Sequence, residues 1–272
     1  MSEARINPDG ALKGRNALVT GASRGIGEAI AARLAMEGAR VVASARTAEE
    51  GESRLSGTLH ETVERIRRAG GEATFIKADL AQSVERERLV EEATAAYGPI
   101  DILINNAAIT YFIPVEEFPE KRFKLMMEVQ VYAPFHLSQL VLPAMRERGR
   151  GWIVNISSPA GLHPQPPYGR GRGGTVYGMC KAALERFTTG LASEVHEAGI
   201  AVNVVSPGLV DTPGVAVHGL INEQTRDRVQ PIEYIAEAVY RLASGDPKTM
   251  TGRIEYAEPF LKSLAVKPAE LV

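Results

Sequence analysis

The sequence predicts an α/β protein in which helices cover both faces of one doubly wound parallel sheet. Three observations support this fold class. Short apolar segments alternate with helical patterns along the chain. Most of these short segments are apolar throughout, and a glycine-rich turn joins the first of them to the first helix. Strands that are apolar on both faces are typical of a parallel sheet buried between two layers of helices.

The expected elements follow from local patterns, in chain order. A strand at 16–20 leads into a helix with Ile26, Ile30 and Leu34 on one face, which Gly38 ends. A strand at 40–45, a helix at 58–69 and a strand at 73–77 follow. The next helix covers 83–97, with Ser83 expected as its N-cap and acidic residues in its first turn.

The second half of the chain repeats the alternation. A strand at 100–104 precedes a long helix at 119–148, which we expect to be interrupted or bent near Pro134. The remaining elements are a strand at 152–156, a helix at 175–198, a strand at 200–205, a helix at 232–243 and an edge strand at 253–256. The right-handed crossover rule arranges such units into a doubly wound sheet.

Composition narrows the class of protein. The chain has 272 residues, of which 44% are apolar and 24% charged, so disordered and collagen-like chains are excluded. A net charge of −2 argues against a general nucleic-acid binder. The single cysteine, Cys180, forms no internal disulfide or multi-thiolate zinc site, and the histidines show no metal-ligand spacing, so no metal site is expected.

We expect one domain over residues 1–272, because no linker divides the chain. Residues 1–13 form a polar N-terminal extension without the apolar core of a signal peptide. No apolar run approaches the roughly 18 residues of a membrane span. We therefore expect a cytoplasmic protein with neither a membrane nor a nucleic acid as partner.

A glycine-rich turn, Thr20 to Gly27, separates the first strand from the first helix. Its glycines, Gly21, Gly25 and Gly27, allow a tight turn and the close approach of a pyrophosphate to the N-terminus of the helix. In this context the turn predicts a dinucleotide-binding site.

This turn resembles the TGxxxGxG motif of the short-chain dehydrogenase/reductase family. Further motifs of the family recur in order over residues 14–255: Asp79-Leu80, Asn105-Asn106-Ala107-Ala108 (with Ala108 in place of glycine), Ser158, the YxxxK pair Tyr177 and Lys181, and Asn203 with Pro207-Gly208 and Thr212. The segment from Glu49 to Leu59 is longer than usual in the family, and in this the chain resembles the hydroxysteroid-dehydrogenase-like branch. The resemblance implies a Rossmann-type fold and these cofactor-binding residues: Gly21, Ser23, Arg24, Gly25, Ile26, Gly27, Arg46, Asp79, Leu80, Asn106, Ala107, Tyr177, Lys181, Pro207, Gly208, Val210 and Thr212.

The end of the second strand predicts which cofactor binds. A carboxylate there would bond the ribose 2′-hydroxyl and repel a 2′-phosphate. Ala45 stands about where that acid would be, Arg46 follows it, and Arg24 lies in the glycine turn. Two arginines without a carboxylate favour NADP over NAD, unless both are solvated surface charges.

Tyr177 and Lys181 are four residues apart on a predicted helix and so share a face. A free tyrosine has a pKa of about 10, and a nearby ammonium group, together with the positive nicotinamide ring, is expected to lower it. The predicted roles are Tyr177 as general acid/base, Lys181 as the group that tunes Tyr177 and holds the ribose, and Ser158 as the donor to the substrate oxygen. Ser157 is an alternative to Ser158. Cys180 is expected to pack in the helix rather than act as a nucleophile.

Two departures from the family pattern stand out. Gln130 occupies the position of an asparagine that, in the family, supports a water-mediated proton path to the lysine, and its side chain is one methylene longer. We include it as a further candidate contributor. Residues 163–174 form an inserted loop between Ser158 and Tyr177 that is rich in Pro, Gly and Arg. This loop is expected to be a lid or an oligomer contact, and Arg170 and Arg172 either bind an anionic substrate group or are solvated.

The predicted function is an NADP-dependent oxidoreductase that transfers a hydride between nicotinamide and a secondary alcohol or ketone. The resemblance implies that residues 209–230 fold over the substrate. Val215, Val217, Leu220 and Ile221 lie there and form either the wall of a pocket for a largely apolar substrate or a buried core contact. The alternative from another class is a dinucleotide-binding sensor or scaffold with little catalysis. A different chemistry, epimerisation or dehydration, is a third hypothesis. Family resemblance implies a homotetramer or homodimer.

Overall fold

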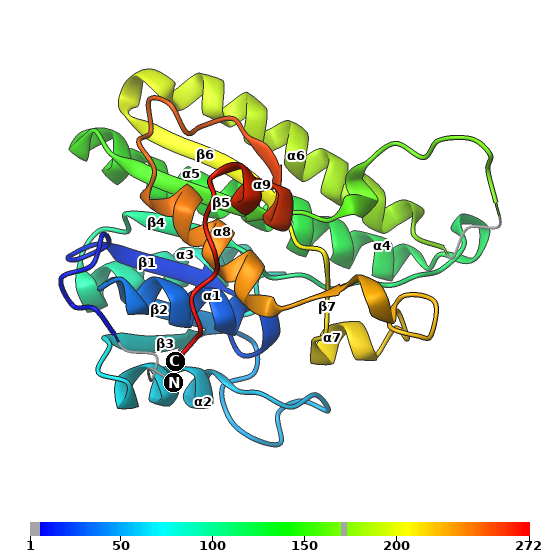
Figure 1. The fold of residues 1–272 in the computed structure, drawn as a ribbon, viewed down its shortest axis with the longest axis horizontal. Helices are drawn as coiled ribbons and strands as arrows, with labels where there is room; N and C mark the ends of the chain where they lie inside the picture. The colour runs from blue at the N-terminus through cyan, green and yellow to red at the C-terminus, as the bar shows by residue number, and fades with distance from the viewer. Residues whose placement is uncertain (1–5, 170–172) are drawn as a thin grey trace.

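A seven-stranded parallel sheet forms the centre of the protein (Figure 1). The computed structural model describes residues 6–169 and 173–272. The order of the strands is β3-β2-β1-β4-β5-β6-β9, and every pair of neighbours is parallel. Their bounds are β1 Asn16–Thr20, β2 Arg40–Ala45, β3 Ala73–Lys77, β4 Ile102–Asn105, β5 Gly151–Ile156, β6 Ile200–Ser206 and β9 Ile254–Tyr256. The predicted doubly wound fold is confirmed, and each predicted strand is present.

Helices cover both faces of this sheet. Their bounds are α1 Gly25–Met36, α2 Leu59–Arg68, α3 Ser83–Tyr97, α4 Glu120–Met127, α5 Ala133–Arg148, α6 Thr175–Val195, α7 Pro213–Ala216, α8 Ile232–Ser244 and α9 Ala257–Ser263. One buried cluster joins the sheet to α1, α2, α8 and α9, and a second joins it to α3, α5 and α6. Burial on both faces explains why the central strands are apolar throughout.

The long helix predicted at 119–148 is interrupted near Pro134, as expected, but the proline is not the point of interruption. It is divided into α4 and α5 by a π-helical segment at Glu128–Tyr132, so the irregular turn lies before Pro134 rather than at it. Pro134 sits in the first turn of α5, where its missing N–H costs little. A π-turn accommodates one extra residue in a helix and redirects the side chains around it, and Gln130 lies within this one.

The expected N-cap of α3 needs correction. Ser83 is the first residue of α3, and the N-cap of this helix is Gln82, whose side chain makes no capping hydrogen bond.

A short pair of strands, β7 at Leu209–Val210 and β8 at Val229–Gln230, lies outside the main sheet in the segment after β6. Among residues 6–169 and 173–272, no helix has the length and apolar character needed to cross a bilayer.

The order of the strands defines the place of a ligand site. β1 and β4 are neighbours in the sheet although β2 and β3 lie between them in sequence, so the chain changes direction there. Loops at the carboxyl ends of β1 and β4 therefore border an open crevice. Buried amides brace this edge, because Asn105 Nδ2 donates to Asn155 Oδ1 (2.8 Å) and Asn155 Nδ2 donates to Thr188 Oγ1 on α6 (2.8 Å).

The N-terminus of α2 provides a test of local stability. Thr58 caps this helix with a reciprocal box, in which its Oγ1 accepts from Glu61 N (3.0 Å) and Glu61 Oε2 accepts from Thr58 N (2.8 Å). We expect Thr58→Ala to lower the free energy of unfolding by about 1 kcal/mol, measured by urea denaturation. Thr58→Ser keeps the capping hydroxyl and is the control. Equal losses in both variants would contradict a capping role.

Candidate active site

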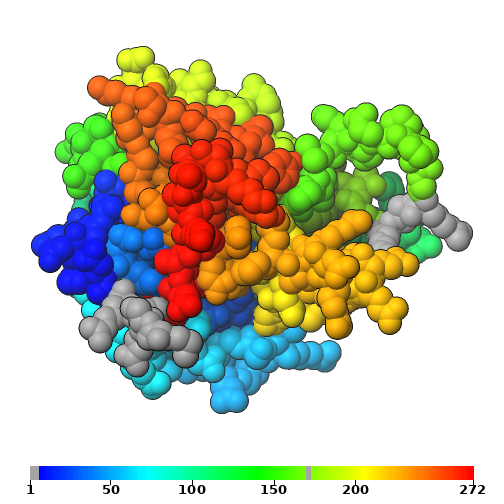
Figure 2. Space-filling model, in the orientation of Figure 1, coloured from blue at the N-terminus to red at the C-terminus, as the bar shows by residue number. Residues whose placement is uncertain are grey.

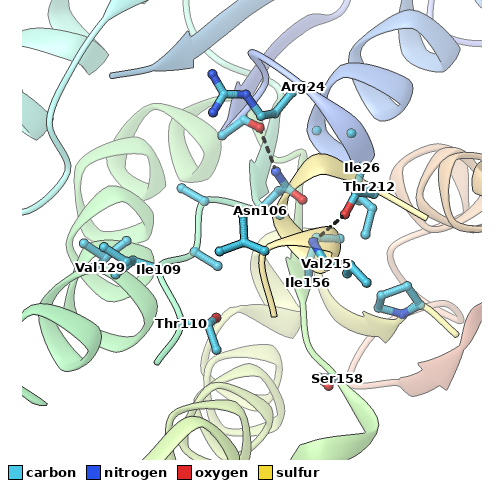
Figure 3. Close-up of a pocket in the computed structure, with 18 of the residues that line it drawn as sticks. Arg24, Ile26, Asn106, Ile109, Thr110, Val129, Ile156, Ser158, Thr212 and Val215 are labelled. Carbon is cyan, nitrogen blue, oxygen red and sulfur yellow. Dashed lines mark hydrogen bonds between the residues drawn. The ribbon is translucent and has the colours of Figure 1, made fainter. Parts of the chain in front are cut away.

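A cavity of about 720 Å³ opens at the carboxyl ends of the central strands. The glycine turn, the loops after β2, β4 and β5, one face of α6 and the segment after β6 all contribute to its wall. Figure 3 shows Arg24 and Ser158 at opposite ends of the group of lining residues, with Asn106 and Thr212 between them. One continuous cavity thus joins the phosphate turn to the region of the candidate catalytic residues.

Every residue predicted to bind the cofactor lines this cavity. The set is Gly21, Ser23, Arg24, Gly25, Ile26, Gly27, Arg46, Asp79, Leu80, Asn106, Ala107, Tyr177, Lys181, Pro207, Gly208, Val210 and Thr212. These residues come from separate parts of the chain, and only the fold brings them together.

The glycine turn suits a pyrophosphate. A side chain at Gly27 would lie 2.2 Å from Gly21 O, so the start of α1 packs directly against the turn. Arg24, the N-cap of α1, makes no side-chain capping hydrogen bond, so the first amides of this helix have no side-chain acceptor from their own cap. Amides at a helix N-terminus attract phosphate oxygens. The residues present therefore fit a dinucleotide.

Asn106 fixes the turn from the neighbouring strand. Its Nδ2 donates to Thr20 O (2.8 Å) and Gly21 O (3.2 Å), and its backbone N donates to Thr20 Oγ1 (3.0 Å). Across the cavity, Thr212 Oγ1 accepts from Val215 N (3.2 Å) and thereby caps α7 (Figure 3). These hydrogen bonds hold opposite walls of the cavity in defined positions.

Tyr177 and Lys181 share a face of α6, as the spacing predicts, and Ser158 approaches from the end of β5. Lys181 is 4% exposed, its Nζ donates to Ile156 O (2.9 Å), and this nitrogen lies 5.6 Å from the centre of the Tyr177 ring. Burial lowers the pKa of Lys181 to about 8. Both titratable groups are therefore desolvated within one small region.

Two effects of the protein itself act on the pKa of Tyr177. Burial of the phenol raises this pKa, and a hydrogen bond with Ser158 acts in the opposite direction. Desolvation of the phenol outweighs this effect, and the nearby ammonium group of Lys181 is itself directed to Ile156 O. Tyr177 and Ser158 both line the cavity, so the candidate acid/base and the candidate donor face the same space.

The alternative candidates occupy different environments. Both serines line the cavity, but Ser157 is buried and its Oγ donates to Glu185 Oε1 (2.6 Å), whereas Ser158 Oγ accepts from Ala160 N (3.2 Å). Cys180 is completely buried, its Sγ lies 3.8 Å from Met127 Sδ, and burial raises its thiol pKa. This environment is that of a packing residue rather than a nucleophile.

Gln130 is not among the residues that line the cavity. It is 1% exposed, and its Nε2 donates to Ile109 O (2.7 Å), so it holds a residue that does line the cavity. Its Oε1 is buried without a hydrogen-bond partner among the described residues. Gln130 lies in the π-helical turn, and its side chain reaches Ile109 O from there.

Sequence patterns missed two aromatic residues of the cavity. The Phe112 ring packs edge-on against Tyr177 (centroids 5.8 Å apart) and against His218 (5.0 Å). Burial lowers the pKa of His218, so the imidazole is neutral at pH 7. Both residues lie in loops, where no periodic pattern marks which side chains face the cavity. The one sequence feature that could have indicated them is that each loop follows a strand that ends at the cavity.

The segment at 209–230 contributes Val215, Val217 and Leu220 to the cavity wall. The described part of the inserted loop contributes no lining residue, although Ile113 N donates to Gly173 O (3.1 Å). Arg170 and Arg172, considered above as anion ligands, lie outside the described residues.

Comparisons with known proteins agree with this geometry. The family model for short chain dehydrogenases matches residues 15–219. An uncharacterized oxidoreductase of Thermotoga maritima is 35% identical over 89% of this chain and 95% of its own. Hydroxysteroid dehydrogenase-like protein 2 of Mus musculus is 31% identical over 95% of this chain and 51% of its own, in line with the second resemblance.

A solved structure is similar throughout. It is a metagenomic short-chain oxidoreductase in complex with NADP, which superposes with a TM-score of 0.72 at 30% identity and covers 96% of this chain and 100% of its own.

Proposed function

The chain belongs to the short-chain dehydrogenase/reductase family of oxidoreductases, and on this premise we propose that it transfers a hydride between NADP and a secondary alcohol or ketone. The observation that carries this proposal is the convergence of Ser158, Tyr177 and Lys181 on the cavity that the glycine turn also borders. The bound nicotinamide supplies the carbon that donates or accepts the hydride.

The three side chains have distinct roles in the proposed reaction. Tyr177 gives its phenolic proton to the carbonyl oxygen during reduction and takes it back during oxidation. Ser158 donates a hydrogen bond to the same oxygen and keeps it within reach of Tyr177, which lines the same cavity. The ammonium group of Lys181, 5.6 Å from the ring centre, stabilises the phenolate.

The proposed substrate is largely apolar near its reacting carbon. Phe112 packs beside Tyr177, and Ile109, Val215 and Leu220 line the same cavity. A panel of ketones that vary in apolar bulk, followed by the loss of NADPH absorbance, tests the proposal. Turnover of an apolar ketone is expected, and its absence across the panel would favour a sensor that binds a dinucleotide without catalysis.

The preference for NADP rests on Arg24 and Arg46, which both line the cavity beside Ala45. The related metagenomic enzyme, which binds NADP, supports it. A guanidinium group pairs well with phosphate oxygens. A carboxylate at this point would instead bond the ribose hydroxyl and repel a phosphate.

Arg46→Asp is expected to change the cofactor preference. A charge-assisted hydrogen bond contributes about 1.5–3 kcal/mol, so the affinity for NADPH should fall by roughly ten- to a hundredfold while that for NADH stays equal or rises. Binding is measured by the fluorescence of each reduced cofactor. Arg54→Asp, an exposed site with the same change of charge, is the control. An unchanged ratio together with tighter binding of NADH by the wild type would contradict the preference.

A further inference from the structure

The segment between β2 and α2, residues 46–58, packs directly against the phosphate turn. Gly57 has a φ of +94°, and a side chain there would lie 2.7 Å from both Ser23 O and Arg24 Cβ. Leu55 of this segment lines the cavity with Arg46 and Thr47. In Figure 2 the segment, in light blue, lies on the same face as the yellow and orange atoms of the 209–230 segment.

This segment holds the guanidinium group of Arg24 through both terminal nitrogens. Nη1 donates to Ser53 Oγ (3.2 Å) and Nη2 donates to Gly57 O (2.7 Å). Both acceptors are uncharged, and among the described residues the side-chain nitrogens of Arg24 form no ion pair with a carboxylate oxygen within 4.0 Å. Its Nε is buried without a hydrogen-bond partner among the same residues. The contacts fix the orientation of the guanidinium group but leave its charge without a counter-ion.

The surrounding charges also favour an anion. Arg24 and Arg46 border the same cavity, and burial, followed by the charge of Arg46, lowers the pKa of Arg24. Glu52 of this segment and Glu61 of α2 have other partners. Glu52 Oε2 accepts from Ala48 N (2.7 Å), and its other carboxylate oxygen pairs with Lys77, while Glu61 is committed to the cap of α2.

We propose that Ser53 and Gly57 position Arg24 to receive a phosphate monoester at the adenosine end of the cavity. The proposal rests on the proposed NADP preference and adds the element on which that preference depends. Arg24 contacts the phosphate, and Ser53 is a positioning residue that acts through Arg24. A long arginine side chain loses conformational freedom when it binds, so holding it beforehand reduces the cost of binding.

Two nucleotide fragments separate this role from a general effect on the fold. Adenosine 2′,5′-bisphosphate carries the extra phosphate, whereas 5′-AMP lacks it. Calorimetric titration of Ser53→Ala should show affinity for the bisphosphate reduced by about three- to tenfold, as for one lost hydrogen bond, with the affinity for 5′-AMP unchanged. Ser56→Ala, an exposed neighbouring serine, is the matched control and should bind both fragments as the wild type does.

A double-mutant cycle tests whether Ser53 acts through Arg24. Arg24→Ala should weaken the bisphosphate more than Ser53→Ala does, and adding Ser53→Ala to Arg24→Ala should cause no further loss. Additive losses, equal losses for both fragments, or no loss in Ser53→Ala would overturn the positioning role. If Arg24→Ala and Arg46→Asp also leave the selectivity for the bisphosphate unchanged, the NADP preference fails as well. If the affinity for the bisphosphate falls in Arg24→Ala but not in Ser53→Ala, only the role of Ser53 is overturned.

Discussion

Tyr177→Phe is expected to lower kcat for ketone reduction by about 10³-fold, within the range for the loss of a general acid. The substitution removes only the hydroxyl group, and the ring keeps its packing against Phe112 at a centroid distance of 5.8 Å. The affinity for NADPH should therefore stay within about twofold of the wild type. Steady-state kinetics gives kcat, and cofactor fluorescence gives the dissociation constant.

Tyr168→Phe is the matched control for this variant. Tyr168 is 77% exposed in the inserted loop and is not among the residues that line the cavity. The same chemical change there should leave kcat unaltered. If Tyr177→Phe kept kcat within a few-fold of the wild type, Tyr177 would not be the acid, and the proposed mechanism would be wrong.

Lys181→Met is expected to lower kcat by roughly a hundredfold and to change the pH profile, because general acid–base catalysis depends on the pKa of the transferring group. The pKa of Lys181 is lowered to about 8 by burial, so the side chain is cationic below this pH and neutral above it. In the wild type, stabilisation of the phenolate is present below about pH 8 and is lost as pH rises through this value.

The rate of reduction, measured as kcat/KM against pH, should therefore fall above about pH 8 in the wild type. Lys181→Met should lack this fall in kcat/KM near pH 8, because methionine does not titrate. Any fall in kcat/KM that remains at higher pH should follow the raised pKa of Tyr177. Lys248→Met, at an exposed lysine, should reproduce the wild-type profile. A limb that persists near pH 8 in Lys181→Met would assign it to another group.

The strands and the phosphate turn could be predicted from sequence because their signals are local. A buried parallel strand is a continuous apolar run, and β1, β2 and β3 have the predicted bounds. The π-helical turn at Glu128–Tyr132 could not be predicted, since one inserted residue hardly alters the helical periodicity. The sequence feature that indicated an interruption was Pro134, but it lies in the first turn of α5, where a proline is tolerated.

The site residues that belong to motifs at the ends of strands could be predicted. Contacts between residues of different loops could not, because they depend on how the loops fold. Phe112 and His218 are 106 positions apart in the sequence, yet their rings pack together. The contacts of Arg24 with Ser53 and Gly57 likewise depend on how the 46–58 segment folds back. Burial raises the pKa of Tyr177, an effect that the sequence does not reveal, because a sequence shows neighbouring charges but not the extent of burial.

The central claim, that Tyr177 serves a hydride transfer in this cavity, is tested most directly with NADPH deuterated at nicotinamide C4. Each C4 face is labelled in turn, and the product of the best ketone is analysed by mass spectrometry. The account predicts deuterium at the carbinol carbon of the wild-type product for one of the two labels, and almost no product with Tyr177→Phe. Unlabelled alcohol with both labels, or labelled product formed by Tyr177→Phe at the wild-type rate, would contradict it.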